Sequence, residues 1–198
     1  AKITPTFYFE FNLIIHGRNK LKLNGAEKIV CVFDENSYSH ERWQTGHYLQ
    51  KENYEKILLQ CLNNPKLGLI FKPKVSLTLK ERLGGDIIKL LNEALETKRC
   101  FIYHDNDNYS VKKNKYSPLL AALSSDLAIH SHLSAGTAAI ECALENIPTI
   151  LIDREKILNS KLRDLPKNKI YFDNWDDAIY SINDYLFSDL KTDIGNWS

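Results

Sequence analysis

From Lys28 onward, short apolar runs alternate with longer stretches in which apolar residues recur every three to four positions. Continuous apolar runs are typical of strands buried on both faces of a parallel sheet, and the longer period is that of amphipathic helices. The predicted strands are 29–33, 69–71, 100–103, 126–130, 149–152 and 169–172. The predicted helices are 54–63, 79–97, 118–123, 138–145 and a last one capped by Asp173 or Asn174.

This alternation predicts an α/β fold: a three-layer, Rossmann-like parallel sheet of about six strands with helices on both faces. Right-handed crossovers place all strand-to-helix loops on one edge of such a sheet, and open α/β sheets bind ligands at that edge. Gly84-Gly85 predicts that the second helix is weakened or kinked there. The loops in which we expect a site are 34–53, 72–78, 104–117, 131–136 and 153–168.

Residues 1–27 do not follow this rhythm. The aromatic and β-branched run 7–15 predicts a strand, and Asn24-Gly25 predicts a turn. Two interpretations stay open: a linker or extra strand of the same domain, or the end of a missing N-terminal domain that precedes the domain 28–198. The chain contains no methionine and begins with Ala1, so we expect it to be incomplete.

Composition excludes several classes of protein. The formal net charge of +1 gives no broad attraction to nucleic acid, and no nucleic-acid partner is predicted. No apolar run approaches the roughly 20 residues that span a bilayer, and no signal peptide opens the chain, so we expect a cytoplasmic protein. The four cysteines form no CxxC pair, which favours buried reduced thiols; no metal and no cofactor are predicted.

A small-residue turn between the fourth strand and its helix is the strongest candidate for chemistry. It contains Ser134, Gly136 and Thr137. The first amides of a helix lack intrahelical partners and face the positive end of the helix dipole, so phosphates bind there. Gly136 would let an oxygen approach the backbone, and the hydroxyls would donate hydrogen bonds. The alternative is an ordinary helix cap, since Ser and Thr are common caps.

Glu141 lies in the second turn of the following helix, whose other positions are mostly Ala, Ile, Cys and Leu. A helix that is apolar nearly all round is buried, so a carboxylate on it needs a partner. A ribose diol would suit it, because a carboxylate accepts two hydroxyl hydrogen bonds. Alternatively, Glu141 and Glu145 mark the solvated stripe of the helix.

The segment 131–153 resembles the donor-binding element of the glycosyltransferase-B superfamily. In the C-terminal domain of that superfamily, a strand, a Ser/Gly/Thr turn, a helix with an acidic residue seven positions before a proline, and a further strand recur. Here Glu141 stands seven positions before Pro148. The fold of that domain fits roughly residues 28–190. The resemblance implies that Ser134, Gly136 and Thr137 contact the diphosphate of a nucleotide-sugar and that Glu141 holds its ribose.

The chain departs from this family in two respects. The loop after the first strand is acidic and has no glycine cradle, although its Asn36 and Ser37 remain candidate hydrogen-bond donors. No N-terminal acceptor domain is present, so no catalytic base is predicted.

Other candidates follow the strands at the same edge. Lys72, Lys74 and Arg154 could neutralise a diphosphate, or they could be solvated loop residues. His130 and His132 could share one face of a strand, but the pair has no obvious third metal ligand, so contact of His130 with phosphate or donor sugar and a structural role stay open.

The function implied by the resemblance is the donor-binding half of a glycosyltransferase for surface polysaccharide. Its expected partners are a nucleotide-sugar donor of UDP, GDP or CDP/CMP type, a saccharide acceptor and a missing N-terminal domain, and the full-length protein could associate peripherally with a membrane. Two alternatives are a non-hydrolysing sugar-nucleotide epimerase-like domain, which shares the architecture, and a receiver-like phosphoacceptor module built on Asp34 and Glu35.

Overall fold

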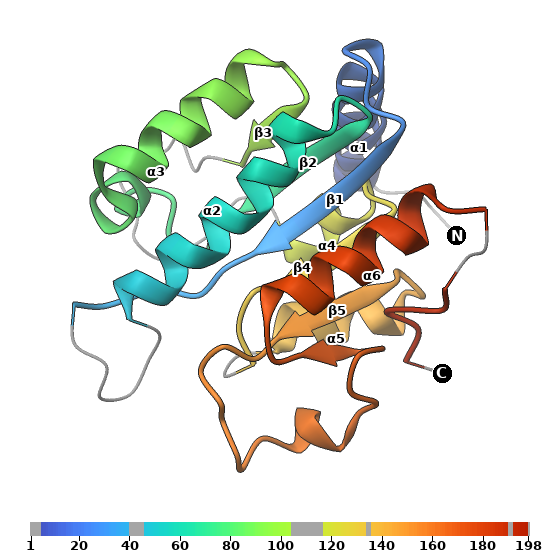
Figure 1. The fold of residues 1–198 in the computed structure, drawn as a ribbon. Coiled ribbons are helices and arrows are strands. Elements are labelled where there is room, and N and C mark those ends of the chain that lie inside the picture. Colours follow the sequence, from blue (N-terminus) through green and yellow to red (C-terminus); the bar gives the residue numbers. More distant parts are fainter. Residues whose placement is uncertain (1–4, 40–45, 104–116, 134–135, 190–191, 198) are drawn as a thin grey trace.

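The computed structural model describes residues 5–39, 46–103, 117–133, 136–189 and 192–197. Helices and strands alternate along this part of the chain, as the apolar pattern predicts (Figure 1). The strands are β1 (Lys28–Phe33), β2 (Leu67–Lys72), β3 (Cys100–Ile102), β4 (Leu127–His130), β5 (Thr149–Ile152) and β6 (Tyr171–Phe172). The helices are α1 (Pro5–Leu23), α2 (His47–Asn63), α3 (Leu79–Glu96), α4 (Pro118–Ala122), α5 (Thr137–Leu144), the 3-10 helix η1 (Lys161–Asp164) and α6 (Trp175–Phe187).

All six strands pair in parallel, in the order β3-β2-β1-β4-β5-β6. This confirms the predicted Rossmann-like parallel sheet. The order reverses between β1 and β4, and such a switch point opens a crevice at the carboxyl ends of the strands. A receiver module of the 2-1-3-4-5 type has a different order, so the receiver-like alternative is wrong.

Helices cover both faces of the sheet (Figure 1). Helices α2, α3 and α6 pack on one face, and α1, α4 and α5 pack on the other. The two faces of β1 show why its run is continuously apolar, because Val30 and Val32 belong to the first core and Ile29 and Cys31 to the second. A strand between two helical layers has no solvated side.

The strand predicted for residues 7–15 is wrong, since this run lies inside the 19-residue helix α1. Strand propensity reflects the fit to a pleated, half-buried surface, and α1 instead runs beside α4 on one face of the sheet. The predicted turn at Asn24-Gly25 ends the helix: Gly25 has a φ of 100° and donates to the Lys22 carbonyl at 3.0 Å.

Other predicted details can be compared with the structure. The kink at Gly84-Gly85 is confirmed by the non-helical φ of 73° and ψ of 174° at Gly84. Asn174 caps α6, since its side chain accepts from the Asp177 amide at 2.8 Å. Helix α2 begins at His47, before the predicted start at Tyr54, because Leu49, Gln50 and Asn53 already face the interior there.

Candidate functional site

A cavity of about 300 Å³ lies where β1, β2 and β4 end, beside the start of α5. It therefore occupies the crevice at the switch point of the sheet. Its volume is at the lower end of ligand pockets in proteins. The lining residues are Phe33, Asp34, Glu35, Lys72, Pro73, Lys74, Pro118, His130, Thr137, Ala138 and Glu141.

Five of the residues predicted from the sequence line this one cavity: Lys72, Lys74, His130, Thr137 and Glu141. They come from three separate stretches of the chain. The parallel sheet gathers them, because each stretch follows or ends a strand whose carboxyl end lies at the same edge.

Asn36, Ser37 and Arg154 are not among the residues that line the cavity. The Asn36 amide donates to the Tyr38 hydroxyl at 3.0 Å. The buried Ser37 hydroxyl lies 2.7 Å from His47 Nδ1 and bonds to Gln50. Arg154 donates to both carboxylate oxygens of Glu52, at 3.1 and 3.0 Å, which directs it toward α2.

Of the predicted turn before α5, the structure describes Gly136 and Thr137. Ser134 lies outside the described residues. Gly136 precedes the first helical residue, and a Cβ at this position would lie 2.4 Å from Leu162 Cδ1. Gly136 thus lies against the loop after β5, and its predicted contact with a ligand stays a prediction.

Thr137 and Glu141 lie one turn apart on α5, so both face the cavity from the same side of the helix. The expectation that α5 is buried nearly all round is wrong. Ile140 is 42% exposed and Leu144 is 76% exposed, while Ala139 and Cys142 are buried. Glu141 is half-buried, so its position in the cavity does not follow from a need to satisfy a fully buried charge.

Lys72 is the last residue of β2 and is only 4% exposed. Its Nζ lies 3.4 Å from the Pro73 carbonyl oxygen. Lysine is almost never buried this deeply unless its charge meets polar groups. From the sequence, Lys72 was expected in a loop at the sheet edge. Its deep burial could not be predicted.

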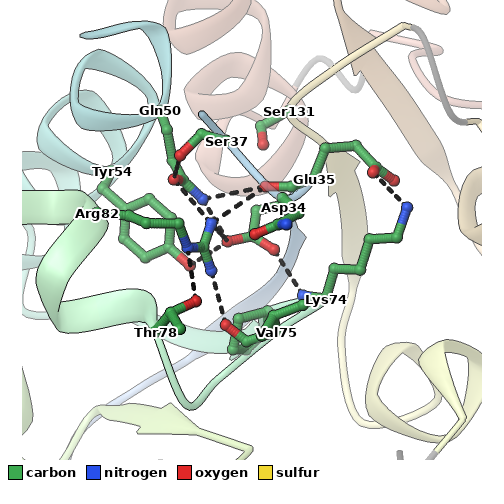
Figure 2. A network of polar contacts seen from close by, with 12 residues as sticks. Asp34, Glu35, Ser37, Gln50, Tyr54, Lys74, Val75, Thr78, Arg82 and Ser131 are labelled. Atoms are coloured by element: carbon green, nitrogen blue, oxygen red, sulfur yellow. Dashed lines mark hydrogen bonds and ion pairs between the residues drawn. The ribbon is translucent and has the colours of Figure 1, made fainter. Parts of the chain in front are cut away.

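Asp34, the first residue after β1, lines the cavity and lies at the centre of a network of polar contacts (Figure 2). Its Oδ2 accepts from Gln50 at 2.8 Å and from the Tyr54 hydroxyl at 3.0 Å, and its Oδ1 accepts from the Lys74 amide at 2.6 Å. Burial raises the pKa of this carboxyl, and the hydrogen bond from Lys74 and the guanidinium of Arg82 oppose that rise. Asp34 thus ties the loop after β2 to the end of β1.

Arg82, on α3, completes this network (Figure 2). It is 5% exposed and donates to Gln50 Oε1 at 2.8 Å and to the Val75 carbonyl at 2.6 Å, and it lies 4.0 Å from Asp34. The network therefore clamps the two loops that carry Glu35 and Lys74. Sequence reasoning missed it, and the only signal was the acidic residue directly after the first strand.

His130 ends β4 and is buried. Its Nδ1 lies 2.7 Å from the His132 carbonyl oxygen, which can only accept, so Nδ1 carries the proton and Nε2 is left as an acceptor. Burial lowers the pKa of His130 to about 4. The ring is therefore neutral at pH 7 and could accept a hydrogen bond from a ligand hydroxyl.

This lowered pKa predicts a loss of stability in acid. Between pH 6.5, the ordinary pKa of histidine, and pH 4, His130 binds a proton in the unfolded chain but not in the folded chain. The free energy of unfolding therefore falls as the pH falls. From pH 6.5 to pH 5 the loss from His130 should be about 2 kcal/mol. Urea unfolding at both pH values measures this loss. In His130→Gln the loss should be smaller than in the wild type by this amount. His16→Gln, on the exposed surface of α1, should keep the full loss; equal losses in all three proteins would contradict the assignment.

A larger cavity, of about 760 Å³, lies near the start of β5 and the end of α5, away from the carboxyl edge. Its lining contains one charged residue, Asp193, and no lysine, arginine or histidine. It therefore offers no cation to a phosphate, in contrast to the smaller cavity.

In the part of the chain that the structure describes, no group of three or more His, Cys, Asp and Glu side chains could hold a metal ion. Among the described helices, none is both long and apolar enough to cross a membrane.

Comparison with known proteins adds little about function. No protein-family model matches the chain, and no curated protein matches it. A solved structure, the N-terminal domain of trehalose-6-phosphate phosphatase from Candida albicans, is similar over 88% of this chain, with 16% sequence identity and a TM-score of 0.47. The match covers 37% of that structure's own chain. At this distance the likeness carries no argument about activity.

Proposed function

We propose that this chain is the donor-binding domain of a glycosyltransferase of the glycosyltransferase-B type, and that the 300 Å³ cavity takes the nucleoside diphosphate part of a nucleotide-sugar. One observation carries the proposal: two lysines, a neutral histidine, a helix-start threonine and a half-buried glutamate line one cavity at the switch point of the sheet. This is the combination of groups that a diphosphate next to a ribose would require.

Each group has a role that its chemistry suits. Lys72 and Lys74 neutralise the diphosphate, and Thr137 adds a hydroxyl and the positive end of the α5 dipole. Glu141 accepts from the ribose diol. His130 Nε2 accepts from a hydroxyl of the donor.

In a transfer reaction, an acceptor hydroxyl attacks the anomeric carbon of the sugar, and the bond from that carbon to the nucleoside diphosphate breaks. The negative charge that develops on the leaving diphosphate is stabilised by preorganised positive groups. Lys72 and Lys74, which line the cavity, are the groups that we assign to this charge. In this proposal the acceptor contacts and the catalytic base belong to a further domain, and the setting we propose is surface polysaccharide synthesis on the cytoplasmic side, with peripheral association of the full-length protein with a membrane.

A panel of nucleotides tests this proposal. At a hundred times its dissociation constant, a ligand adds about 2.7 kcal/mol to the free energy of unfolding, which for a domain of this size raises the melting temperature by about 5–10 °C. Among UDP, GDP, CDP and CMP, we expect one to give this shift. The absence of a shift with all four would exclude nucleotide binding by this domain.

Glu141→Ala should weaken the binding of that nucleotide by about tenfold to 150-fold, because hydrogen bonds to a charged group contribute about 1.5–3 kcal/mol. Its effect on the free energy of unfolding should stay within about 0.5 kcal/mol, since the side chain is half-buried and alanine favours helix. Calorimetric titration and urea unfolding measure the two effects. Glu145→Ala, exposed one turn later, is the matched control and should change neither. If Glu141→Ala unfolds the chain, Glu141 is structural.

A further inference from the structure

Glu35 and Lys74 form an ion pair at the cavity, with Lys74 Nζ 2.5 Å from Glu35 Oε2 (Figure 2). The Lys74 side chain is 52% exposed and the Glu35 side chain 15% exposed, so the pair lies at the solvent side of the lining. The two residues belong to different loops. Asp34 holds these loops together through the Lys74 amide, so a part-buried hydrogen bond brings the pair together.

This pair changes what the cavity offers to an anion. Its lining contains two lysines and three carboxylates, of Asp34, Glu35 and Glu141. The more exposed lysine is already neutralised by Glu35. An anion that binds Lys74 must therefore displace the Glu35 carboxylate. When the anion dissociates, the ion pair between Glu35 and Lys74 can form again.

We propose that Glu35 is a release latch for the site: it competes with the bound diphosphate for Lys74 and so speeds dissociation of the nucleoside diphosphate left after transfer. This inference rests on the proposed function, because it requires an anionic ligand at this cavity. It assigns a role to the acidic residue that stands where a glycine-rich phosphate contact would be expected. No covalent step is involved, since one ion pair replaces another.

Pyrophosphate is the probe for the test, with calorimetry for affinity and stopped-flow displacement for the dissociation rate. Removing the competing carboxylate with Glu35→Gln should tighten binding by about threefold to fivefold, which matches the upper range for a partly exposed ion pair. Most of the change should lie in a slower dissociation rate. Glu81→Gln removes the same charge from the exposed surface of α3 and should change neither quantity.

A double-mutant cycle separates the latch from simple repulsion. In a Lys74→Met background, Glu35→Gln should give no gain, because the latch acts through Lys74. A gain that persists without Lys74, or the absence of a gain in the single variant, would overturn the latch while leaving nucleotide binding intact. If no variant binds pyrophosphate and no nucleotide stabilises the chain, the latch and the proposed function both fail.

Discussion

Replacing Arg82 with methionine should lower the free energy of unfolding by about 3–5 kcal/mol, the usual effect of removing one partner from a buried ionic network. Asp34 would stay buried with its opposing guanidinium gone, and the Val75 and Glu35 carbonyls would each lose a donor. Urea unfolding at pH 7 measures the change. Because the same network holds the Lys74 amide against Asp34, the variant should also bind nucleotide more weakly.

Lys80→Met is the matched control for this substitution, because Lys80 is exposed on the same helix. It should change stability by no more than about 0.5 kcal/mol. A loss below about 1 kcal/mol in Arg82→Met would show that the network contributes little to the fold.

Lys72→Met should weaken nucleotide binding by at least about 30-fold, because removing one member of a buried charge pair costs about 2–5 kcal/mol. The pair in question would form between Lys72 and the diphosphate. The stability of the unliganded variant separates the two possible roles of Lys72, because a lysine whose charge serves the fold lowers the free energy of unfolding when it is removed. Lower affinity together with unchanged or higher stability is the combination that a purely structural lysine would not give.

Calorimetric titration and urea unfolding on the same preparations measure both quantities. Lys80→Met again serves as the control and should keep wild-type affinity. Wild-type affinity in Lys72→Met would remove this lysine from the site. A large loss of stability in that variant would show that Lys72 serves the fold.

The sheet could be predicted from the sequence because a parallel strand is buried on both faces, so runs such as 29–33 are continuously apolar. The candidate site followed from the same rule. Lys72 and His130 end strands, and in a parallel sheet every such residue reaches the same edge. The local apolar pattern and the topology of a parallel sheet were therefore enough to predict that these residues, distant in sequence, lie close together.

The features that were missed depend on packing between segments. Helix α1 was predicted as a strand because aromatic and β-branched residues suit either a pleated surface or a packed helix, and only the neighbours decide. The contact between Arg82 and Asp34 joins residues far apart in sequence through side-chain geometry. The packing of Leu162 against Gly136 was likewise missed, because Leu162 lies in another loop.

The smaller and the larger cavity described above provide the most direct test of the central claim, because their linings share no residue and differ in charge. The measurement is a titration of amide chemical shifts of the ¹⁵N-labelled protein with the nucleotide that stabilises it. We predict that the largest shifts fall at 33–35, 72–74, 137–138 and Glu141, around the smaller cavity. Shifts confined to 143–148 and 193–197, around the larger cavity, or the absence of any shift with all four nucleotides, would contradict the account.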